Sequence, residues 1–119
     1  MHKILLTGSS GFIGLNIINS FSEKHKFYII VRKKPKKEFL KKKNIKVIKF
    51  KNYDSLNIKL KKLRVDTVIH CATHYVKNHE FSDINKFCSS NLLFGNIILE
   101  NLKSLGAKKF INFSTVWED

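Results

Sequence analysis

Three glycines near the N-terminus, Gly8, Gly11 and Gly14, are spaced so that together they could bind a phosphate group. Gly8 can adopt the backbone conformation of a sharp turn. Gly11 has no side chain to hold a phosphate away from the main chain, and Gly14 lets the following helix pack closely. The start of that helix offers N–H groups and the positive end of its dipole to an anion. The stretch therefore predicts a site for the pyrophosphate of a dinucleotide. Its other predicted contacts are Ser10, Phe12 and Ile13.

The context of these glycines supports a binding site over a tight turn without a ligand. An apolar run that favours a strand precedes them, and residues 12–24 favour a helix. The spacing is Gly-x-x-Gly-x-x-Gly, which differs from the commoner Gly-x-Gly-x-x-Gly of dinucleotide-binding domains. No Gly-Lys-Ser/Thr follows, so the stretch is not a P-loop.

The end of the next apolar run, residues 26–31, predicts which dinucleotide is preferred. An NAD site places an Asp or Glu there to accept a hydrogen bond from the ribose 2′-hydroxyl. This chain has Arg32-Lys33-Lys34 instead, 21 residues after Gly11. Arginine binds a phosphate with a planar, charged fork, so NADP(H) is favoured over NAD(H). The alternative is that these three residues belong to the general lysine excess of the chain.

Further candidates lie after the third predicted strand, residues 45–50, and at the end of the fourth, residues 65–72. Asp54 could lie near the adenine, although Asn52, Tyr53 or a merely solvated turn would fit as well. Ala72 is small where the nicotinamide ribose would pass. His70 and Cys71 point to opposite faces of a regular strand, so they cannot both bind one metal ion, and packing roles are expected for both.

The last candidates come from the fifth predicted strand and from the helix before it. The fifth predicted strand, residues 108–113, runs into Ser114 and Thr115, whose hydroxyls would face the crevice at the carboxyl edge of a parallel sheet. Ordinary polarity at the end of a strand is the alternative. Asn91 and Gly95 lie on the apolar face of a long helix predicted over residues 82–105 and ended by Gly106. A polar group and a glycine on a buried face indicate close packing beside a site. The alternative is a partly exposed asparagine in a chain that is rich in polar residues.

Strands alternate with helices along the whole chain, and the remaining helices are predicted over residues 36–43 and 55–63. This pattern is typical of an α/β fold with a doubly wound parallel sheet. Right-handed crossovers with one change of direction give a Rossmann-like sheet with strand order 3-2-1-4-5. We expect a single Rossmann domain over residues 1–119, ending after strand five.

The composition limits the other possibilities. The chain of 119 residues has two cysteines without a disulfide framework, no apparent signal peptide and no run of about 20 apolar residues, so we expect a cytoplasmic protein with no membrane partner. The net charge is +14, and eleven Lys/Arg against one acid lie within residues 32–51. A solvated basic surface is the simplest interpretation, although a basic nucleic-acid-binding domain is a less favoured alternative.

Together these residues resemble the extended short-chain dehydrogenase/reductase family, the NAD(P)-dependent epimerases and dehydratases of nucleotide sugars. Thr7–Gly14 is similar to the TGxxGxxG motif of the family, and Asp66–Ala72 is similar to its D-x-V-x-H-x-A strand. Asn91–Gly95 is similar to its N-x-x-x-G helix, and Phe113–Thr115 to the strand that carries the catalytic Ser/Thr. The last residues also resemble dideoxy-sugar reductases of the CDP-abequose synthase type.

The resemblance implies NAD(P) in a Rossmann domain, a nucleotide-sugar substrate in a C-terminal domain and commonly a homodimer. Thr115 would be the catalytic Ser/Thr that hydrogen-bonds the reacting oxygen, and Asn91 would be the helix asparagine of the family. The family's base is the tyrosine of a Tyr-x-x-x-Lys motif, and none of Tyr28, Tyr53 and Tyr75 has a lysine four residues later. We therefore expect the cofactor-binding part of an enzyme, with little turnover by itself. The alternative is a non-catalytic NAD(P)-sensing module.

Overall fold

The computed structural model of the chain describes residues 1–9, 11–32, 37–40, 42–71 and 93–113. The predicted site residues outside this part of the chain are Ser10, Lys33, Lys34, Ala72, Asn91, Ser114 and Thr115. The part of the predicted helix before residue 93 also lies outside it. Within the described residues, no helix is long and apolar enough to cross a membrane.

Five parallel strands form one sheet in the order β3-β2-β1-β4-β5, as the alternation of strands and helices predicts. The central strand β1 and its neighbour β2 consist mostly of apolar residues and are buried along most of their length. The bounds of the strands are β1 (Lys3–Thr7), β2 (Lys26–Val31), β3 (Ile45–Lys49), β4 (Thr67–His70) and β5 (Lys109–Asn112). Thr7 in β1 pairs with Ile30 in β2 and with His70 in β4, so the carboxyl ends of the three strands meet at one edge.

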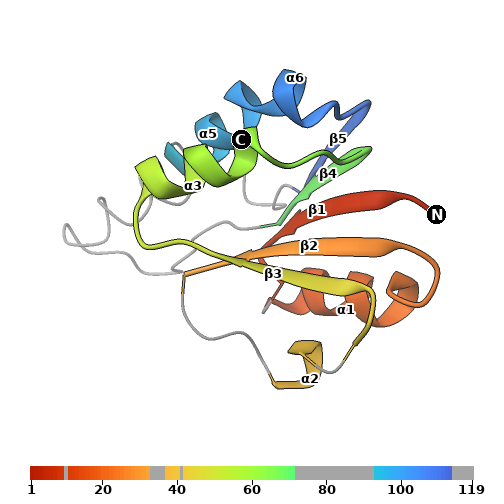
Figure 1. Cartoon of the computed structure of the whole chain (residues 1–119). Coiled ribbons are helices and arrows are strands. Elements are labelled where there is room, and N and C mark those ends of the chain that lie inside the picture. Colours follow the sequence, from red (N-terminus) through yellow and green to blue (C-terminus); the bar gives the residue numbers. More distant parts are fainter. Residues whose placement is uncertain (10, 33–36, 41, 72–92, 114–119) are drawn as a thin grey trace, which may run out of the picture.

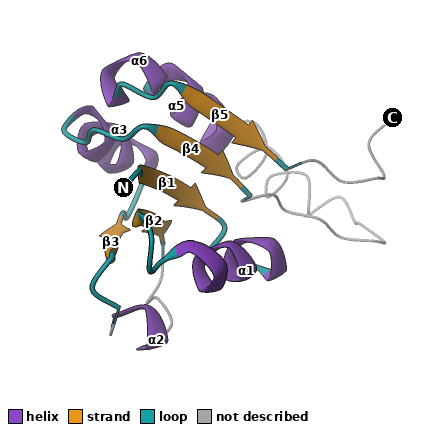
Figure 2. Ribbon diagram, turned by 90° about the vertical axis from the view of Figure 1, so that its right-hand side faces the viewer, coloured by secondary structure: helices purple, strands orange, loops and turns teal. Residues whose placement is uncertain are grey.

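Helices cover both faces of the sheet, as Figures 1 and 2 show. On one face lie α1 (Phe12–Phe21) and α2 (Lys37–Leu40), and on the other lie α3 (Tyr53–Lys61), α5 (Phe94–Glu100) and α6 (Leu102–Leu105). Alternate residues of β1 serve the two cores: Leu5 packs with the α3 side, whereas Ile4 and Leu6 pack with the α1 side. This period of two is expected for a strand that is buried on both faces.

Asp66, just before β4, ties together the amino ends of three strands. Its carboxylate accepts a hydrogen bond from the Lys3 main-chain N–H at 2.8 Å, and its own N–H donates to the Lys3 carbonyl at 2.8 Å. Its main-chain carbonyl accepts from the Lys108 N–H at 2.8 Å. The bond from Lys3 holds the pKa of the Asp66 carboxyl below its usual value. Asp66 therefore aligns β1, β4 and β5 at the edge opposite the glycine turn, which gives the first residue of the D-x-V-x-H-x-A strand a structural role.

The predicted continuous helix over residues 82–105 is wrong at Asn101, where α5 ends and α6 begins. The Asn101 side chain is buried and donates to the Ile97 carbonyl and to the Asn57 side chain, each at 2.8 Å. Such a local side-chain bond to the backbone competes with the helical pattern. Helical spacing predicts Gly95, Ile98 and Leu99 on the apolar face and Phe94 off it. Ile98 is buried, but Leu99 is 49% exposed and Phe94 is 8% exposed, so the buried face is displaced. Gly106 ends α6 in the left-handed conformation, as predicted.

The third helix begins two residues earlier than predicted, because Asn52 is its N-cap. The Asn52 side chain accepts a hydrogen bond from the Ser55 N–H at 2.8 Å, and the Ser55 hydroxyl accepts one from the Asn52 N–H at 3.3 Å. This reciprocal pair is a capping box. Residues 52–54, predicted to be a turn, are therefore the rigid start of α3. This position brings Tyr53 and Asp54 to the carboxyl edge of the sheet, near the end of β2.

Candidate functional site

The glycine turn connects the carboxyl end of β1 to α1. Gly8 has φ of +74°, the left-handed region that favours glycine, and its carbonyl accepts a hydrogen bond from the Gly11 N–H at 3.1 Å. Gly11 is the N-cap of α1, and since it has no side chain it cannot cap the helix itself. The first turn of α1 thus presents its backbone N–H groups at the edge of the sheet, an arrangement suited to an anion.

Gly11 and Gly14 are required for different reasons. A Cβ atom added to Gly14 would lie 2.1 Å from the Gly8 carbonyl oxygen and 2.9 Å from its carbon, so only glycine lets α1 contact the turn here. A Cβ atom added to Gly11 would be 3.5 Å from the same oxygen, which is ordinary van der Waals contact. The fold therefore has room for a side chain at Gly11, and its absence leaves open space above the turn.

The other residues of the turn differ in exposure. Phe12 is 84% exposed, and Ile13 is 42% exposed. Ser9 is 3% exposed, and its hydroxyl makes no hydrogen bond within the part of the chain that the structure describes. A buried hydroxyl beside an open, N–H-rich turn fits an anionic ligand such as a pyrophosphate.

His70 and Thr7 join the ends of β4 and β1 beneath the turn. Thr7 Oγ1 lies 2.7 Å from His70 Nδ1 and accepts a hydrogen bond from the Cys71 N–H at 3.1 Å. The His70 ring packs between Phe94 and Phe110 on the α5 side of the sheet, and a Cβ atom on Gly95 would lie 3.7 Å from its Nε2 atom. Cys71 packs instead in the core on the α1 side. The two residues lie on opposite faces, as the strand period predicts, so they do not face a common metal ion.

Burial lowers the pKa of His70 below its ordinary value, and this predicts a pH dependence of stability. Above the pKa of an unfolded histidine, about 6.5, the ring is neutral in both states and stability is complete. Below it the unfolded state takes up a proton that the folded state resists, so the free energy of unfolding falls by at most about 1.4 kcal/mol per pH unit. Urea unfolding between pH 7.5 and 5.5 should show this loss, and His70→Gln should reduce it. Equal slopes for the two proteins would contradict the prediction.

Arg32 follows β2 and lies over two aromatic rings. Its guanidinium carbon is 4.8 Å from the centre of the Tyr53 ring and 5.4 Å from that of Phe50. The two rings lie side by side, with centres 6.0 Å apart and planes inclined by 28°. Among the three residues proposed for the adenine end, Asn52 is thus engaged as a helix cap and Tyr53 contacts Arg32.

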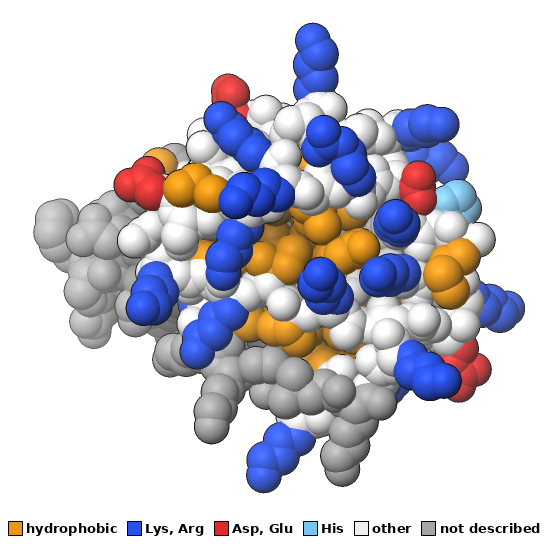
Figure 3. Space-filling model, in the orientation of Figure 1, with side chains coloured by type: hydrophobic (Ala, Val, Ile, Leu, Met, Phe, Trp, Pro, Cys, Tyr) orange, Lys and Arg blue, Asp and Glu red, His pale blue; other side chains and the backbone are white. Residues whose placement is uncertain are grey.

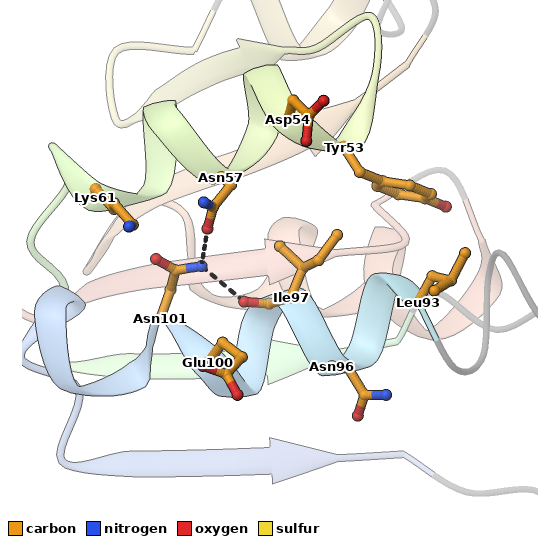
Figure 4. Close-up of a pocket in the computed structure, with 9 residues that line it drawn as sticks. All are labelled: Tyr53, Asp54, Asn57, Lys61, Leu93, Asn96, Ile97, Glu100 and Asn101. Carbon is orange, nitrogen blue, oxygen red and sulfur yellow. Dashed lines mark hydrogen bonds between the residues drawn. The ribbon is translucent and has the colours of Figure 1, made fainter.

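Asp54 lies in the first turn of α3 and lines a groove of about 420 Å³ between α3 and α5. Figure 4 shows the groove with Asp54 and Tyr53 pointing in different directions, Tyr53 toward Leu93. The hydrogen bond between Asn101 and Asn57 crosses its floor. Asp54 therefore lies next to Tyr53 at the start of α3 and shares its groove with residues from α5.

The basic face of the molecule lies over β3 and α3 (Figure 3). A shallow groove there is lined by four lysines around an apolar floor. Lys46 and Lys49 come from β3, whereas Lys59 and Lys62 come from α3 and its end. The basic surface thus extends beyond the predicted segment of residues 32–51.

Residues 4–118 match the model of the NAD dependent epimerase/dehydratase family. Among curated proteins, the chain is 32% identical to dTDP-D-glucose 4,6-dehydratase of Dictyostelium discoideum over 97% of its own length. It is 31% identical to CDP-abequose synthase of Yersinia pseudotuberculosis over 98% of its length. It spans 29% and 40% of those two relatives, respectively.

Solved structures agree on the fold. The enzyme WbmG of Bordetella bronchiseptica, in complex with NAD, matches 97% of this chain with a TM-score of 0.81 at 21% identity. WbmH of the same organism, in complex with NAD+, matches 98% with a TM-score of 0.78 at 24% identity. This chain spans 38% and 40% of those proteins, so it corresponds to a portion of them.

These comparisons confirm the family and the nicotinamide dinucleotide class of cofactor predicted from the sequence. They do not favour the sensing module or the nucleic-acid-binding domain. By its five-stranded parallel sheet, its glycine turn and the match over nearly its whole length, the chain belongs to the NAD dependent epimerase/dehydratase family.

Proposed function

We propose that this chain is the cofactor-binding portion of an NAD(P)-dependent epimerase, dehydratase or reductase of nucleotide sugars. The observation that carries the proposal is the glycine turn: a left-handed Gly8 at the end of the central strand β1, followed by a glycine N-cap at Gly11. The turn and the first residues of α1 hold the pyrophosphate, with Ser10, Phe12 and Ile13 alongside. A nicotinamide dinucleotide held there would supply hydride transfer to and from the sugar.

The residues of this chain fit such a cofactor at three points. The open space at Gly11 admits a phosphate, and the hydroxyl of Ser9 is buried beside it. Arg32 lies at the end of β2, where the adenosine ribose binds in a Rossmann domain. By their place after β4 and β3, Ala72 would lie beside the nicotinamide ribose and Asp54 near the adenine. By the family resemblance, Thr115 would hydrogen-bond the reacting oxygen and Asn91 would be the helix asparagine of the family.

The substrate and the assembly are part of the same proposal. The curated relatives carry names of nucleotide-sugar enzymes, and a WbmG structure holds UDP as well as NAD. We propose that the protein acts in the cytoplasm on a nucleotide sugar, as a homodimer, and that the portion described here has little turnover by itself. Mixing it with NADPH and nucleotide sugars and finding hydride transfer would contradict the last point.

NADP(H) is the cofactor we propose over NAD(H), because Arg32 supplies a planar cation where an NAD site has an acid. Titration calorimetry with NADPH and NADH tests both parts of the proposal. The chain should bind NADPH more tightly than NADH. Arg32→Ala should weaken NADPH about tenfold, since it removes one charge-assisted interaction with the 2′-phosphate, and should leave NADH nearly unchanged.

Lys26 offers a matched control at the other end of the same strand. Its ammonium lies 5.3 Å from the centre of the Tyr28 ring, so Lys26→Ala also removes one cation from an aromatic ring, but at the amino edge of the sheet. This variant should bind both dinucleotides like the wild type. If it weakens NADPH as much as Arg32→Ala does, the effect is one of net charge and the NADP preference is refuted. If neither dinucleotide binds the wild type, the proposed function itself fails.

A further inference from the structure

We propose that Tyr53 is a positioning residue for cofactor selection: its ring holds the Arg32 guanidinium where the 2′-phosphate of NADP(H) binds. The inference builds on the proposed function and adds a residue to it. The sequence alone predicts Tyr53 only as one of three candidate neighbours of the adenine. The structure pairs it with Arg32, 21 residues earlier in the chain.

The Arg32 side chain is exposed and belongs to a residue type with many rotamers, which oppose a fixed position. Two rings restrict it here. The Tyr53 ring centre lies 4.8 Å from the guanidinium carbon, nearer than the Phe50 ring centre at 5.4 Å. Contacts of this kind between a guanidinium and an aromatic face are attractive, so they keep the cation over the rings.

Tyr53 is itself held in place from three directions. The capping box of Asn52 and Ser55 fixes the first turn of α3, which carries the ring. The Tyr53 ring lies beside Phe50, which is 2% exposed. The centre of the Tyr53 ring is 6.3 Å from that of Phe94 in α5. The Phe50 N–H in turn donates to the Val31 carbonyl at 3.2 Å, next to Arg32. The support under the arginine is therefore part of the packed core.

The geometry suits phosphate recognition. A guanidinium donates hydrogen bonds in its own plane, whereas an aromatic ring contacts its face. A guanidinium over the Tyr53 ring can still donate in its own plane to a phosphate, and a planar fork fits phosphate oxygens. Because NADH has a hydroxyl in place of the 2′-phosphate, ordering Arg32 benefits NADPH alone. Tyr53 should therefore act on the ratio of the two affinities.

The test compares Tyr53→Leu, which removes the ring, with Tyr53→Phe, which keeps it. Dissociation constants for NADPH and NADH are measured by calorimetry on the chain used above. Tyr53→Leu should weaken NADPH about three- to tenfold and NADH less than about twofold, and Tyr53→Phe should bind both like the wild type. In the Arg32→Ala background, Tyr53→Leu should have no further effect on NADPH.

Other outcomes would overturn the inference. If Tyr53→Leu weakens both dinucleotides equally, or still weakens NADPH in the Arg32→Ala background, Tyr53 acts through the fold and not through Arg32. If it changes neither affinity, Arg32 needs no ring. Should Tyr53→Leu unfold, Tyr53→Met removes the ring while filling the space and is judged by the same ratio. Loss of NADPH preference on Arg32→Ala together with wild-type behaviour of both ring-free variants would refute this inference and leave the proposed function intact.

Discussion

Replacing Gly14 by alanine is expected to lower the free energy of unfolding by about 3 kcal/mol or more, at the upper end of overpacking effects. The added Cβ atom would lie 2.1 Å from the Gly8 carbonyl oxygen, 2.9 Å from the Gly8 carbonyl carbon and 3.0 Å from the Ser9 Cα atom. All three are backbone atoms, so no side chain can turn away and α1 must separate from the turn. Urea or thermal unfolding followed by circular dichroism measures the effect.

Gly11→Ala is the control for this variant. Its Cβ atom would have 3.5 Å to the nearest heavy atom, and Gly11 has φ of −78°, which alanine adopts freely. Its cost should not exceed about 1 kcal/mol, the usual range for alanine at an N-cap. If the proposed function is right, Gly11→Ala should nevertheless weaken NADPH and NADH alike, because the methyl group occupies the space of the pyrophosphate. Equal melting temperatures for Gly14→Ala and the wild type would contradict the predicted clash.

Thr7→Val is expected to cost about 1–3 kcal/mol of stability, the range for leaving a buried polar group without its partner. Valine keeps the branched shape of threonine but removes the oxygen that lies 2.7 Å from His70 Nδ1. The Thr7 side chain is fully buried and His70 is 5% exposed, so water cannot easily replace that oxygen. The Cys71 N–H also loses its bond to Oγ1 and keeps the Thr7 main-chain carbonyl at 3.2 Å. Urea unfolding at pH 7.5, where His70 is neutral, measures the difference.

Thr7→Ser separates the hydroxyl from the methyl group. Serine keeps the oxygen and loses one methyl group, which should cost about 1 kcal/mol. The predicted order of stability is therefore wild type, Thr7→Ser, Thr7→Val. If the serine variant is the less stable of the two, packing of the methyl group outweighs the hydrogen bond and the role given to the Thr7–His70 pair is wrong.

The arrangement of strands could be predicted because it depends on local patterns and on general rules of topology. Apolar runs alternate with helical periodicity, and right-handed crossovers then leave one order for the sheet. The turn at Gly8 and the end of the helix at Gly106 could also be predicted from the sequence, since only glycine commonly adopts positive φ. The Rossmann fold and the family follow from such short-range signals.

The contacts that organise the site are between residues far apart in the chain, and no sequence period marks them. Thr7 and His70 are 63 residues apart, as are Lys3 and Asp66. Arg32 contacts Tyr53 only when β2, β3 and α3 are packed together. The break at Asn101 likewise depends on a partner, Asn57, from another helix. Motifs identify which residues matter, whereas their tertiary partners decide what each side chain does.

The central place of β1 also has a consequence for the order in which the protein folds. Its first neighbour β2 pairs 23 residues along the chain, but its second neighbour β4 pairs 63 residues along it. Chain-closure entropy makes the longer connection costlier by about 0.9 kcal/mol before any contact is gained. During synthesis, β1, α1, β2 and β3 are complete when residue 50 has been made, while the other edge of β1 still lacks its partner. Pairing with β4 is therefore expected after pairing with β2, and it is the step that brings His70 to Thr7.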